Sequence, residues 1–324
     1  MKALVYDGVE TLTFRNMPSA VSSADQELVR IASSGICGSD MHAYLGHDPR
    51  RPAPLILGHE AAGTILGGAR DGERVTINPL VGCGVCRYCM SGRENLCPDR
   101  TIISMPPRQG AFAELVAMRP ENLVTVPDHV PLDKAALAEP LAVSWHSVRL
   151  GLAALDPNAS RTALVLGGGA IGVAAALALK AQGFESVTVA ERSQTRRRFV
   201  ENQCLISSVP AGTGQYGLVI DAVGYAATRE IASTIAEPGG VIVHIGLGED
   251  LGGLDIRRMT LQEITFIGTY TYTPQDFRDT CTAIFDGRLG PLDWTEPRSL
   301  SDGATAFSDL RAGRVAAPKI ILHP

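Results

Sequence analysis

Apolar and polar positions alternate over short distances in the first part of the chain, up to about residue 148. Six short apolar runs are separated there by turns of glycine, proline and charged residues: LVYDGV, ELVRIASSG, AAGTIL, RVTINPL, ELVAM and LVTVP. Alternation with a period of two, bounded by turn-forming residues, predicts strands that bury one face. This stretch is therefore predicted to form a β-rich, barrel-like domain.

A different pattern begins at about residue 149 and continues to residue 270. The run TALVLGGG is followed by AIGVAAALALKAQG and then by SVTVAER, which is the order strand, glycine turn, helix, strand. GLVIDAVG, GGVIVHIG and ITFIGTY supply further continuous apolar strands, as expected for a parallel sheet buried on both faces. Residues 149–270 are thus predicted to form a doubly wound Rossmann domain in an α/β protein.

The end of the chain is predicted to rejoin the first domain. From residue 271 it leads to the strand-like run KIILHP, so that residues 1–148 and 271–324 are expected to form one domain. Within the second domain, the chain between SVTVAERSQ and GLVIDAVG is short for a helix, a strand and another helix. CLISSV is therefore expected to form a brief strand with little helix after it.

Composition and charge narrow the class of protein. With 324 residues, 45% hydrophobic and 19% charged, the chain has the composition of a globular protein large enough for two cores. Its net charge of −5 comes from mixed signs without a long basic run, which argues against nucleic acid or an anionic membrane as a partner. The sequence has no run of about 18 apolar residues and no signal-peptide core at its N-terminus, so a cytoplasmic location is expected.

Four of the seven cysteines crowd into one short segment. Cys83, Cys86, Cys89 and Cys97 form the pattern C-x2-C-x2-C-x7-C, and gaps of two residues let a loop wrap a single ion. Four thiolates with this spacing predict a structural zinc. Thiolates also hold iron–sulfur clusters, so a cubane cluster is the other metal interpretation, and four unpaired loop thiols are the interpretation without metal.

Three further segments carry donors that suit a catalytic metal. Cys37, the adjacent pair His59 and Glu60, and Glu139 together offer one thiolate, one imidazole and one or two carboxylates. That set matches a catalytic zinc, which uses three protein ligands and leaves a fourth position for water or substrate. Each residue also has an ordinary explanation: a lone cysteine is usually a small buried apolar residue, and a carboxylate at a helix start is favoured by the helix dipole.

The glycine-rich turn after the first strand of the second domain predicts a nucleotide site. Gly167, Gly169 and Gly172 fit G-x-G-x-x-G, with Ala170 and Ile171 between the last two, and the motif lies between an apolar strand and an alanine-rich helix. Glycine permits the sharp turn, the approach of a pyrophosphate to the backbone and close helix packing, and the helix N-terminus attracts the phosphates.

The residues after the next predicted strand bear on the choice of dinucleotide. Glu191 ends that strand, and a carboxylate there binds ribose hydroxyls and repels a 2′-phosphate, which favours NAD over NADP. Arg192 and the arginine run that begins at Arg196 complicate this prediction, because arginines accommodate a 2′-phosphate. A solvated helix face is the plainer interpretation of that run.

The order of these motifs resembles that of the medium-chain, zinc-containing alcohol dehydrogenase superfamily over essentially the whole chain. The resemblance rests on C-x-S-D-x-H at 37–42, G-H-E at 58–60, the four-cysteine segment and the glycine-rich turn. The run AEPLA at 138–142 is similar to the sorbitol and threonine dehydrogenase branch, in which a glutamate replaces the cysteine zinc ligand of simple alcohol dehydrogenases. The resemblance implies a GroES-like catalytic domain, a Rossmann cofactor domain, and a homodimer or homotetramer.

The same resemblance implies roles for individual residues. Cys37 and His59 would bind the catalytic zinc. Glu60 or Glu139 would complete the shell of ligands, directly or through water. Ser39 would take the proton of the alcohol, and His42 would pass it towards solvent. Backbone near the nicotinamide half of the cofactor would come from Val223, Gly224, Gly246, Leu247, Thr269 and Tyr270.

The expected activity is hydride transfer from a secondary alcohol, a polyol or sugar alcohol, to NAD, with a ketone as product and two zinc ions per chain. A threonine 3-dehydrogenase or a simple alcohol dehydrogenase of the same superfamily is the first alternative. A zinc-free quinone or enoyl reductase would not need Cys37, His59 and the cysteine segment. A zinc-ribbon binding protein without catalysis is disfavoured because the sequence has no basic patch.

Overall fold

The computed structural model describes residues 1–184 and 186–324, and within them the chain forms two compact units. The first unit contains residues 1–139, 273–286 and 295–324, and the second contains residues 140–272 and 287–294. The sequence placed the division at 148/149, whereas in the structure it falls near the start of helix α3 (Ala138–Ala154). No turn marks this junction, because the helix runs through it.

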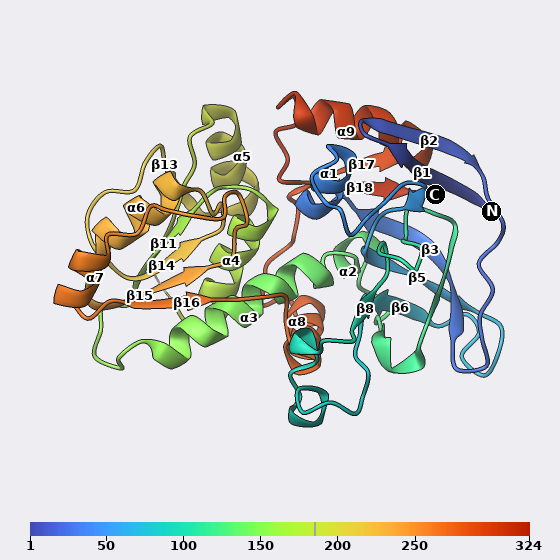
Figure 1. Ribbon diagram of the computed structural model, residues 1–324, viewed down its shortest axis with the longest axis horizontal. Coiled ribbons are helices and arrows are strands. Elements are labelled where there is room, and N and C mark those ends of the chain that lie inside the picture. The colour runs from blue at the N-terminus through green and yellow to red at the C-terminus, as the bar shows by residue number, and fades with distance from the viewer. Residues whose placement is uncertain (185) are drawn as a thin grey trace. The chain divides into compact units, whose positions relative to one another are not determined.

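Antiparallel strand pairs dominate the first unit. Its larger sheet has the order β10-β6-β5-β3-β18-β17, with β9 also paired to β3, and a smaller sheet has the order β2-β1-β4. All six predicted apolar runs contain strands (Figure 1). The strands are β1 (Lys2–Gly8), β2 (Thr11–Asn16), β3 (Glu27–Gly35), β4 (Leu55–Ile56), β5 (Glu60–Leu66), β6 (Arg74–Ile77), β7 (Leu80–Val81), β8 (Thr101–Ile102), β9 (Leu115–Met118), β10 (Leu123–Thr125), β17 (Thr295–Ser299) and β18 (Lys319–His323).

Aliphatic side chains from these strands form the core of the first unit. Val29, Ile65, Val75 and Ile77 are fully buried in one cluster. Strands β3 and β5 approach closely at Gly63, where an added Cβ would lie 2.0 Å from the carbonyl oxygen of Arg30. The helices of this unit are α1 (Gly38–Tyr44), α2 (Leu132–Ala135), α8 (Pro274–Phe285) and α9 (Gly303–Arg311), with 3₁₀ turns at Cys89–Ser91, Glu94–Leu96, Pro120–Asn122 and Leu300–Asp302.

The C-terminal strand belongs to the first unit, as the run KIILHP predicts. Strand β18 pairs antiparallel with β3, so that Ile321 lies opposite Gly35, and it pairs in parallel with β17. This pairing brings the last residues of the chain beside the segment that leads from β3 into α1.

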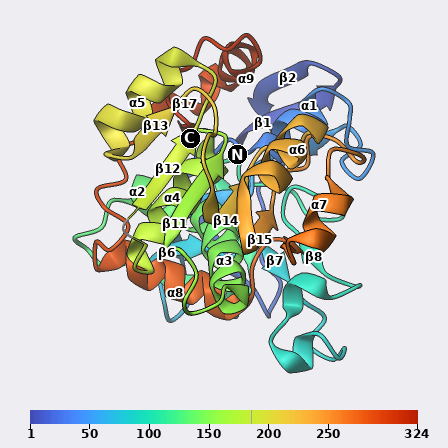
Figure 2. The same cartoon turned by 90° about the vertical axis from the view of Figure 1, so that its left-hand side faces the viewer.

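The second unit contains the predicted parallel sheet, with the strand order β13-β12-β11-β14-β15-β16. The side chains of the central strands β11 and β14 are buried after the first residue of each, as a sheet covered on both faces requires. Helix α4 contacts β11 and β12, and α6 contacts β14 and β15 (Figure 2). Besides α3, the elements are β11 (Thr162–Leu166), α4 (Ala170–Ala181), β12 (Ser186–Ala190), α5 (Gln194–Cys204), β13 (Ser207–Val209), β14 (Tyr216–Asp221), α6 (Ala226–Ile235), β15 (Ala236–His244), α7 (Ile256–Leu261) and β16 (Thr265–Gly268).

The strand order of the second unit reverses between β11 and β14. Doubly wound sheets bind ligands at the carboxyl ends of the strands on either side of such a reversal. The α/β fold class expected from the sequence is confirmed. Strand β13 is three residues long and the chain reaches β14 without an intervening helix, as the short passage predicts. None of the helices in the described residues combines the length and apolarity needed to cross a lipid bilayer.

Candidate metal and cofactor sites

Three of the predicted donors meet in the first unit. The ligand atoms of Cys37, His59 and Glu60 all lie within 4.8 Å of one another. Cys37 precedes the first turn of α1. His59 lies immediately before β5, and Glu60 is the first residue of that strand. Gly58, which precedes them, has a φ of +89°, a conformation that glycine adopts without strain. Gly35 leaves the space for the carboxylate, because an added Cβ there would lie 2.1 Å from Oε2 of Glu60.

Hydroxyls and a carboxylate surround both nitrogens of the His59 ring. Nδ1 lies 3.4 Å from Oδ1 of Asp40 and 3.4 Å from Oγ of Ser104, and Nε2 lies 3.5 Å from Oγ of Ser39. Asp40 is fully buried and also accepts hydrogen bonds from the backbone N–H groups of Cys37 and Gly58. A carboxylate on the far nitrogen of a metal-binding histidine is a common arrangement, because it orients the ring and makes the ligand more basic.

The charges of this site favour a bound cation. Burial opposes the protonated form of His59, but the interactions of the ring with Asp40 and Cys37 outweigh it and raise the pKa of His59 well above its usual value. A metal ion requires the neutral imidazole, so binding one here would release a proton.

The two oxygens of Glu60 have different surroundings. Oε1 accepts a hydrogen bond of 2.6 Å from Nζ of Lys319, which also donates to the carbonyl of Ile36 at 2.9 Å. Oε2 is buried and has no hydrogen-bond partner in the described part of the chain. A buried carboxylate oxygen without a donor is costly unless a cation completes its surroundings, so this residue set fits a metal ion.

Glu139 lies outside the group of three donors. It is 7% exposed, and its charge is one of the influences, after those of Glu60 and Cys37, that offset burial and raise the pKa of Lys319. His42 lies on the exposed side of α1, and its ring centroid is 6.3 Å from that of His47.

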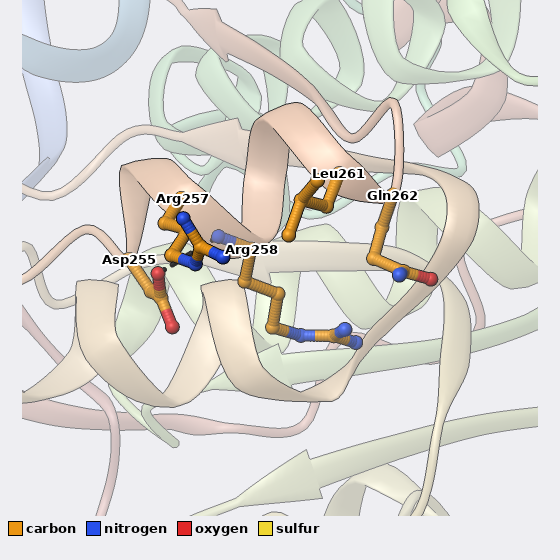
Figure 3. A pocket seen from close by; sticks show the side chains of 5 residues that line it. All are labelled: Asp255, Arg257, Arg258, Leu261 and Gln262. Carbon is orange, nitrogen blue, oxygen red and sulfur yellow. Dashed lines mark hydrogen bonds between the residues drawn. The ribbon is translucent and has the colours of Figure 1, made fainter.

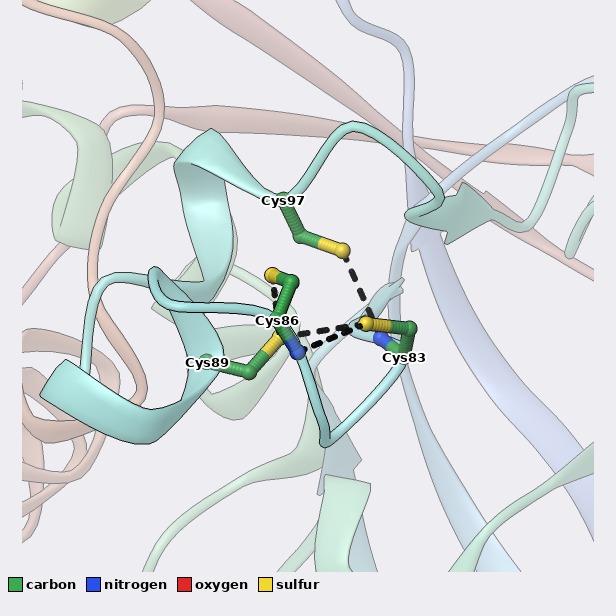
Figure 4. A group of neighbouring side chains, drawn as sticks. All are labelled: Cys83, Cys86, Cys89 and Cys97. Carbon is green, nitrogen blue, oxygen red and sulfur yellow. Dashed lines mark hydrogen bonds between the residues drawn. The ribbon is translucent and has the colours of Figure 1, made fainter.

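The cysteine segment forms a second group of donors. The sulfur atoms of Cys83, Cys86, Cys89 and Cys97 lie within 4.8 Å of one another and point towards a common centre (Figure 4). Cys83 and Cys89 are 4.0 Å apart and Cys86 and Cys89 are 3.6 Å apart, close to the spacing of about 3.8 Å that follows from Zn–S bonds near 2.3 Å in a tetrahedron. All four are free cysteines.

The four thiols differ in acidity. Hydrogen bonds from the backbone N–H groups of Val85 and Cys86 lower the pKa of Cys83 to about 7, whereas burial raises the pKa of Cys89 to about 12. A bound metal would supply the positive charge that four neighbouring thiolates need.

In the second unit, the glycine turn has the shape that a dinucleotide needs. Gly167 has a φ of +98°, and a Cβ on Gly172 would lie 1.8 Å from the carbonyl oxygen of Gly167. Gly169 precedes α4 without a side-chain cap, and a Cβ there would meet nothing within 4 Å. Ala170 and Ile171 begin the helix. The N-terminus of this 12-residue helix therefore has no side-chain cap and has space beside Gly169, which fits a phosphate group.

Glu191 follows β12 beside this turn. Its Oε2 accepts a hydrogen bond from the N–H of Gly168 at 2.9 Å, and its Oε1 accepts one from Ser193 at 2.7 Å. Arg192 is exposed, and Nε of the half-buried Arg196 has no hydrogen-bond partner in the described residues.

The predicted nicotinamide segments follow the neighbouring strands. Oδ1 of Asp221 accepts hydrogen bonds from the N–H groups of Val223 and Gly224, and a Cβ on Gly224 would lie 2.2 Å from the carbonyl oxygen of Gly246. Leu247 is 80% exposed. Thr269 and Tyr270 are half-buried after β16. All these segments leave the carboxyl ends of β14, β15 and β16, so the structure brings them to one edge of the sheet.

Three residues of the first site, Asp40, Ser104 and Lys319, have no role predicted from the sequence. Asp40 lies within the C-x-S-D-x-H motif, so its spacing from Cys37 was a usable signal. Ser104 and Lys319 are 45 and 259 residues from their partners His59 and Glu60, and nothing local in the sequence points to them.

A shallow hollow along α7 is lined by Asp255, Arg257, Arg258, Leu261 and Gln262 (Figure 3). The guanidinium of Arg258 donates hydrogen bonds to three main-chain carbonyls at the end of α6 and the start of β15. This side chain therefore braces the main chain, and we assign no chemistry to the hollow.

Known proteins with similar sequences match almost the whole chain. Residues 23–128 match the alcohol dehydrogenase GroES-like domain. The L-galactonate-5-dehydrogenase of Escherichia coli K12 is 30% identical, over 89% of this chain and 88% of that protein. The chain belongs to the zinc-containing, medium-chain alcohol dehydrogenase superfamily. The sorbitol dehydrogenase of Bacillus subtilis, 29% identical over 84% of this chain and 82% of its own length, supports the polyol branch.

Solved structures of this superfamily share the fold. A zinc-binding dehydrogenase of Sinorhizobium meliloti, bound to NADP, has a TM-score of 0.89 and 26% identity over 100% of this chain and 99% of its own. A protein described as a short chain alcohol dehydrogenase of Escherichia coli CFT073, complexed with NADH, also has a TM-score of 0.89, with 25% identity over the same shares of the two chains. As a member of this superfamily, the protein is an oxidoreductase that uses zinc and a nicotinamide cofactor.

Proposed function

We propose that this dehydrogenase oxidises a secondary alcohol, a polyol or sugar alcohol, to the ketone with NAD as hydride acceptor. The observation that carries the proposal is the group Cys37, His59 and Glu60 with its unpartnered, buried Glu60 oxygen. The sequence relatives named for L-galactonate and sorbitol support a substrate with several hydroxyls.

In this proposal Cys37 and His59 hold a catalytic zinc. A zinc ion held by these residues would supply Lewis acidity that makes the hydroxyl of the alcohol more acidic. Asp40 keeps the imidazole oriented through Nδ1. Glu60 is favoured as the third ligand, because Lys319 occupies only one of its two oxygens, whereas Glu139 lies outside the donor group.

The proton of the alcohol is proposed to leave through Ser39. Its hydroxyl lies 3.5 Å from Nε2 of His59, at the edge of the proposed metal site, so it is placed to accept a hydrogen bond from a substrate hydroxyl there. His42, on the exposed side of α1, is the proposed proton carrier to solvent.

The second unit is proposed to bind the cofactor, with the pyrophosphate at the N-terminus of α4. Glu191, held by Gly168 and Ser193, would present its charge to the ribose and repel a 2′-phosphate, which supports NAD over NADP. Arg192 and Arg196 are proposed to lie around the adenosine ribose. The first unit, which carries both donor groups, is the proposed catalytic domain.

The four-cysteine segment is proposed to hold a second, structural zinc. Because this site needs reduced thiols, a cytoplasmic location fits it. A homo-oligomer is also proposed, since β16 is an edge strand of the parallel sheet and the segment that connects β15 to β16 carries exposed apolar side chains, at Leu247, Leu251, Ile256 and Leu261.

Metal analysis combined with a substrate screen tests the proposed function. Two zinc ions per chain are expected in the parent protein, and one in Cys97→Ser. NAD reduction should be fastest with sorbitol, xylitol, L-galactonate or butane-2,3-diol, and slow with ethanol or L-threonine. A preference for threonine or ethanol, or for NADP, would refute the corresponding assignment. Turnover that survives replacement of both Cys37 and His59 would refute the zinc chemistry.

A further inference from the structure

Arg51 is a buried arginine beside the proposed metal site. It lies in the loop between α1 and β4, and its side chain is only 2% exposed. Its Nη1 donates hydrogen bonds of 3.0 Å to the carbonyl of Ser39 and to Oδ2 of Asp48, and its Nε donates one of 3.0 Å to the carbonyl of Ser104. One guanidinium therefore joins three separate segments of the first unit.

The two serines held by Arg51 are the two whose hydroxyls flank His59. Oγ of Ser39 faces Nε2 of the ring at 3.5 Å, and Oγ of Ser104 faces Nδ1 at 3.4 Å. Ser104 has a φ of +70°, a left-handed conformation that a residue with a Cβ rarely adopts without support. The hydrogen bond from Nε of Arg51 to the carbonyl of Ser104 is one such support.

The chemistry of the guanidinium suits this bracing role. Its planar fork donates in several fixed directions at once, which the point charge of a lysine cannot do. The carboxylate of Asp48, itself 6% exposed, compensates the buried charge of Arg51. A buried and hydrogen-bonded pair of this kind defines geometry far better than a surface ion pair.

We propose that Arg51 is a positioning residue that fixes the hydroxyl of Ser39 and the ring of His59 relative to the metal site. The inference rests on the proposed function, in which Ser39 exchanges a proton with the substrate. It extends that function to a side chain that touches neither metal nor substrate.

Two substitutions at residue 51 and a matched control test this role. Arg51→Met removes all three hydrogen bonds, and Arg51→Lys keeps the charge but not the fork. Arg50→Met is the control, because Arg50 also binds Asp48, at 2.8 Å, but is 61% exposed. Each variant is assayed in the reduction of acetoin or D-xylulose with NADH and with [4,4-²H₂]NADH.

We expect Arg51→Met to lower kcat by about 10-fold, the lower end of the cost of losing an outer-shell partner, with a smaller change in KM. The deuterium isotope effect on kcat should rise, because a misplaced proton donor slows the chemical step and leaves product release unchanged. Arg51→Lys should recover part of the rate, and Arg50→Met should match the parent.

A second readout does not depend on turnover. With cobalt(II) in place of zinc, the visible absorption bands report the geometry of the ligands around the metal. Arg51→Met should shift the bands of the Cys37 and His59 centre, and Arg50→Met should not. If Arg51→Met fails to fold, Arg51→Lys provides the same two readouts.

The outcomes separate this inference from the proposed function. An active parent whose isotope effect and cobalt bands are unchanged in Arg51→Met would overturn the role of Arg51 and leave the proposed function standing. Equal decreases in kcat in Arg51→Met and Arg50→Met would also overturn the role of Arg51. An inactive parent whose cobalt bands respond only to residue 51 would refute the proposed function and support the positioning role.

Discussion

At the scale of single residues, the carboxylate of Glu60 depends on Lys319 as its only close cationic side-chain partner among the described contacts. Both side chains are almost completely buried and their charged atoms are 2.6 Å apart. Burial disfavours the charged lysine, but Glu60 and Cys37 outweigh it and raise the pKa of Lys319. Lys319 is therefore expected to keep its positive charge at neutral pH although it is buried.

Lys319→Met should destabilise the protein by about 3–5 kcal/mol, because it leaves a buried carboxylate without its partner. The loss in free energy of urea unfolding should be larger after chelation, when no metal cation faces Glu60. Lys2→Met, at an exposed lysine of the same unit, is the control and should change stability by less than about 0.5 kcal/mol. Equal stabilities of the two variants would contradict this account of the pair.

Glu73 provides a pH-dependent contribution to stability. Hydrogen bonds from Arg70, at 2.6 and 2.9 Å, and from the hydroxyl of Thr125 lower the pKa of Glu73 to about 2. A depressed carboxylate pKa means that the folded state binds the proton less readily than the unfolded state does. The stabilisation is therefore complete above the unfolded pKa of about 4.3 and is lost as the pH falls towards 2.

Glu73→Gln should flatten the acid side of the stability curve between about pH 4.5 and pH 2. The measurement is the unfolding free energy at several pH values, with Glu121→Gln, at an exposed glutamate, as the control. An acid slope that is as steep in Glu73→Gln as in the parent would show that this carboxylate does not contribute.

At the scale of elements, the turn between β11 and α4 uses its glycines for two different reasons. Gly172 is required by packing, because its Cα approaches the carbonyl of Gly167 too closely for a Cβ. Gly169 has open space around it, so its lack of a side chain matters only if a ligand comes close to the backbone there.

Substitutions with alanine should separate these two reasons. Gly172→Ala should lower the melting temperature without any ligand, because the added methyl group displaces backbone. Gly169→Ala should leave the melting temperature of the free protein unchanged but weaken NADH binding by about 10-fold or more, since the methyl group occupies the path of the pyrophosphate. Thermal unfolding and fluorescence titration measure the two effects. Unchanged NADH affinity in Gly169→Ala would place the pyrophosphate elsewhere.

At the scale of the whole molecule, association between copies is expected to involve the second unit. Leu251 and Leu261, in the segment between β15 and β16, are 83% and 65% exposed, and large exposed apolar side chains indicate a contact surface. The double substitution Leu251→Glu with Leu261→Glu should shift the mass measured by light scattering towards the monomer. Val21→Glu, at an 85% exposed residue of the first unit, should not. A monomeric parent would contradict the predicted oligomer.

Much of the fold and the four-cysteine group could be predicted because their signals are local in the chain. The grouping of Cys37 with His59 and Glu60 rested instead on their donor types and on the family resemblance. Apolar alternation predicts the strands of the first unit, and continuous apolar runs predict the parallel sheet. The spacing of Cys83 to Cys97 identifies four thiols that one loop can bring together. The division between the units was placed less well, because α3 continues through it.

The sequence by itself determined which residue types are available for chemistry and in which elements they lie, since periodicity, glycine turns and cysteine spacing act over a few residues. Only the tertiary structure decided which of them meet. Pairing of β18 with β3 brings Lys319 to Glu60, and the loop after β8 brings Ser104 to His59. Such contacts depend on strand register and on the closure of long loops, which the free energy of the whole folded chain selects and no local pattern encodes.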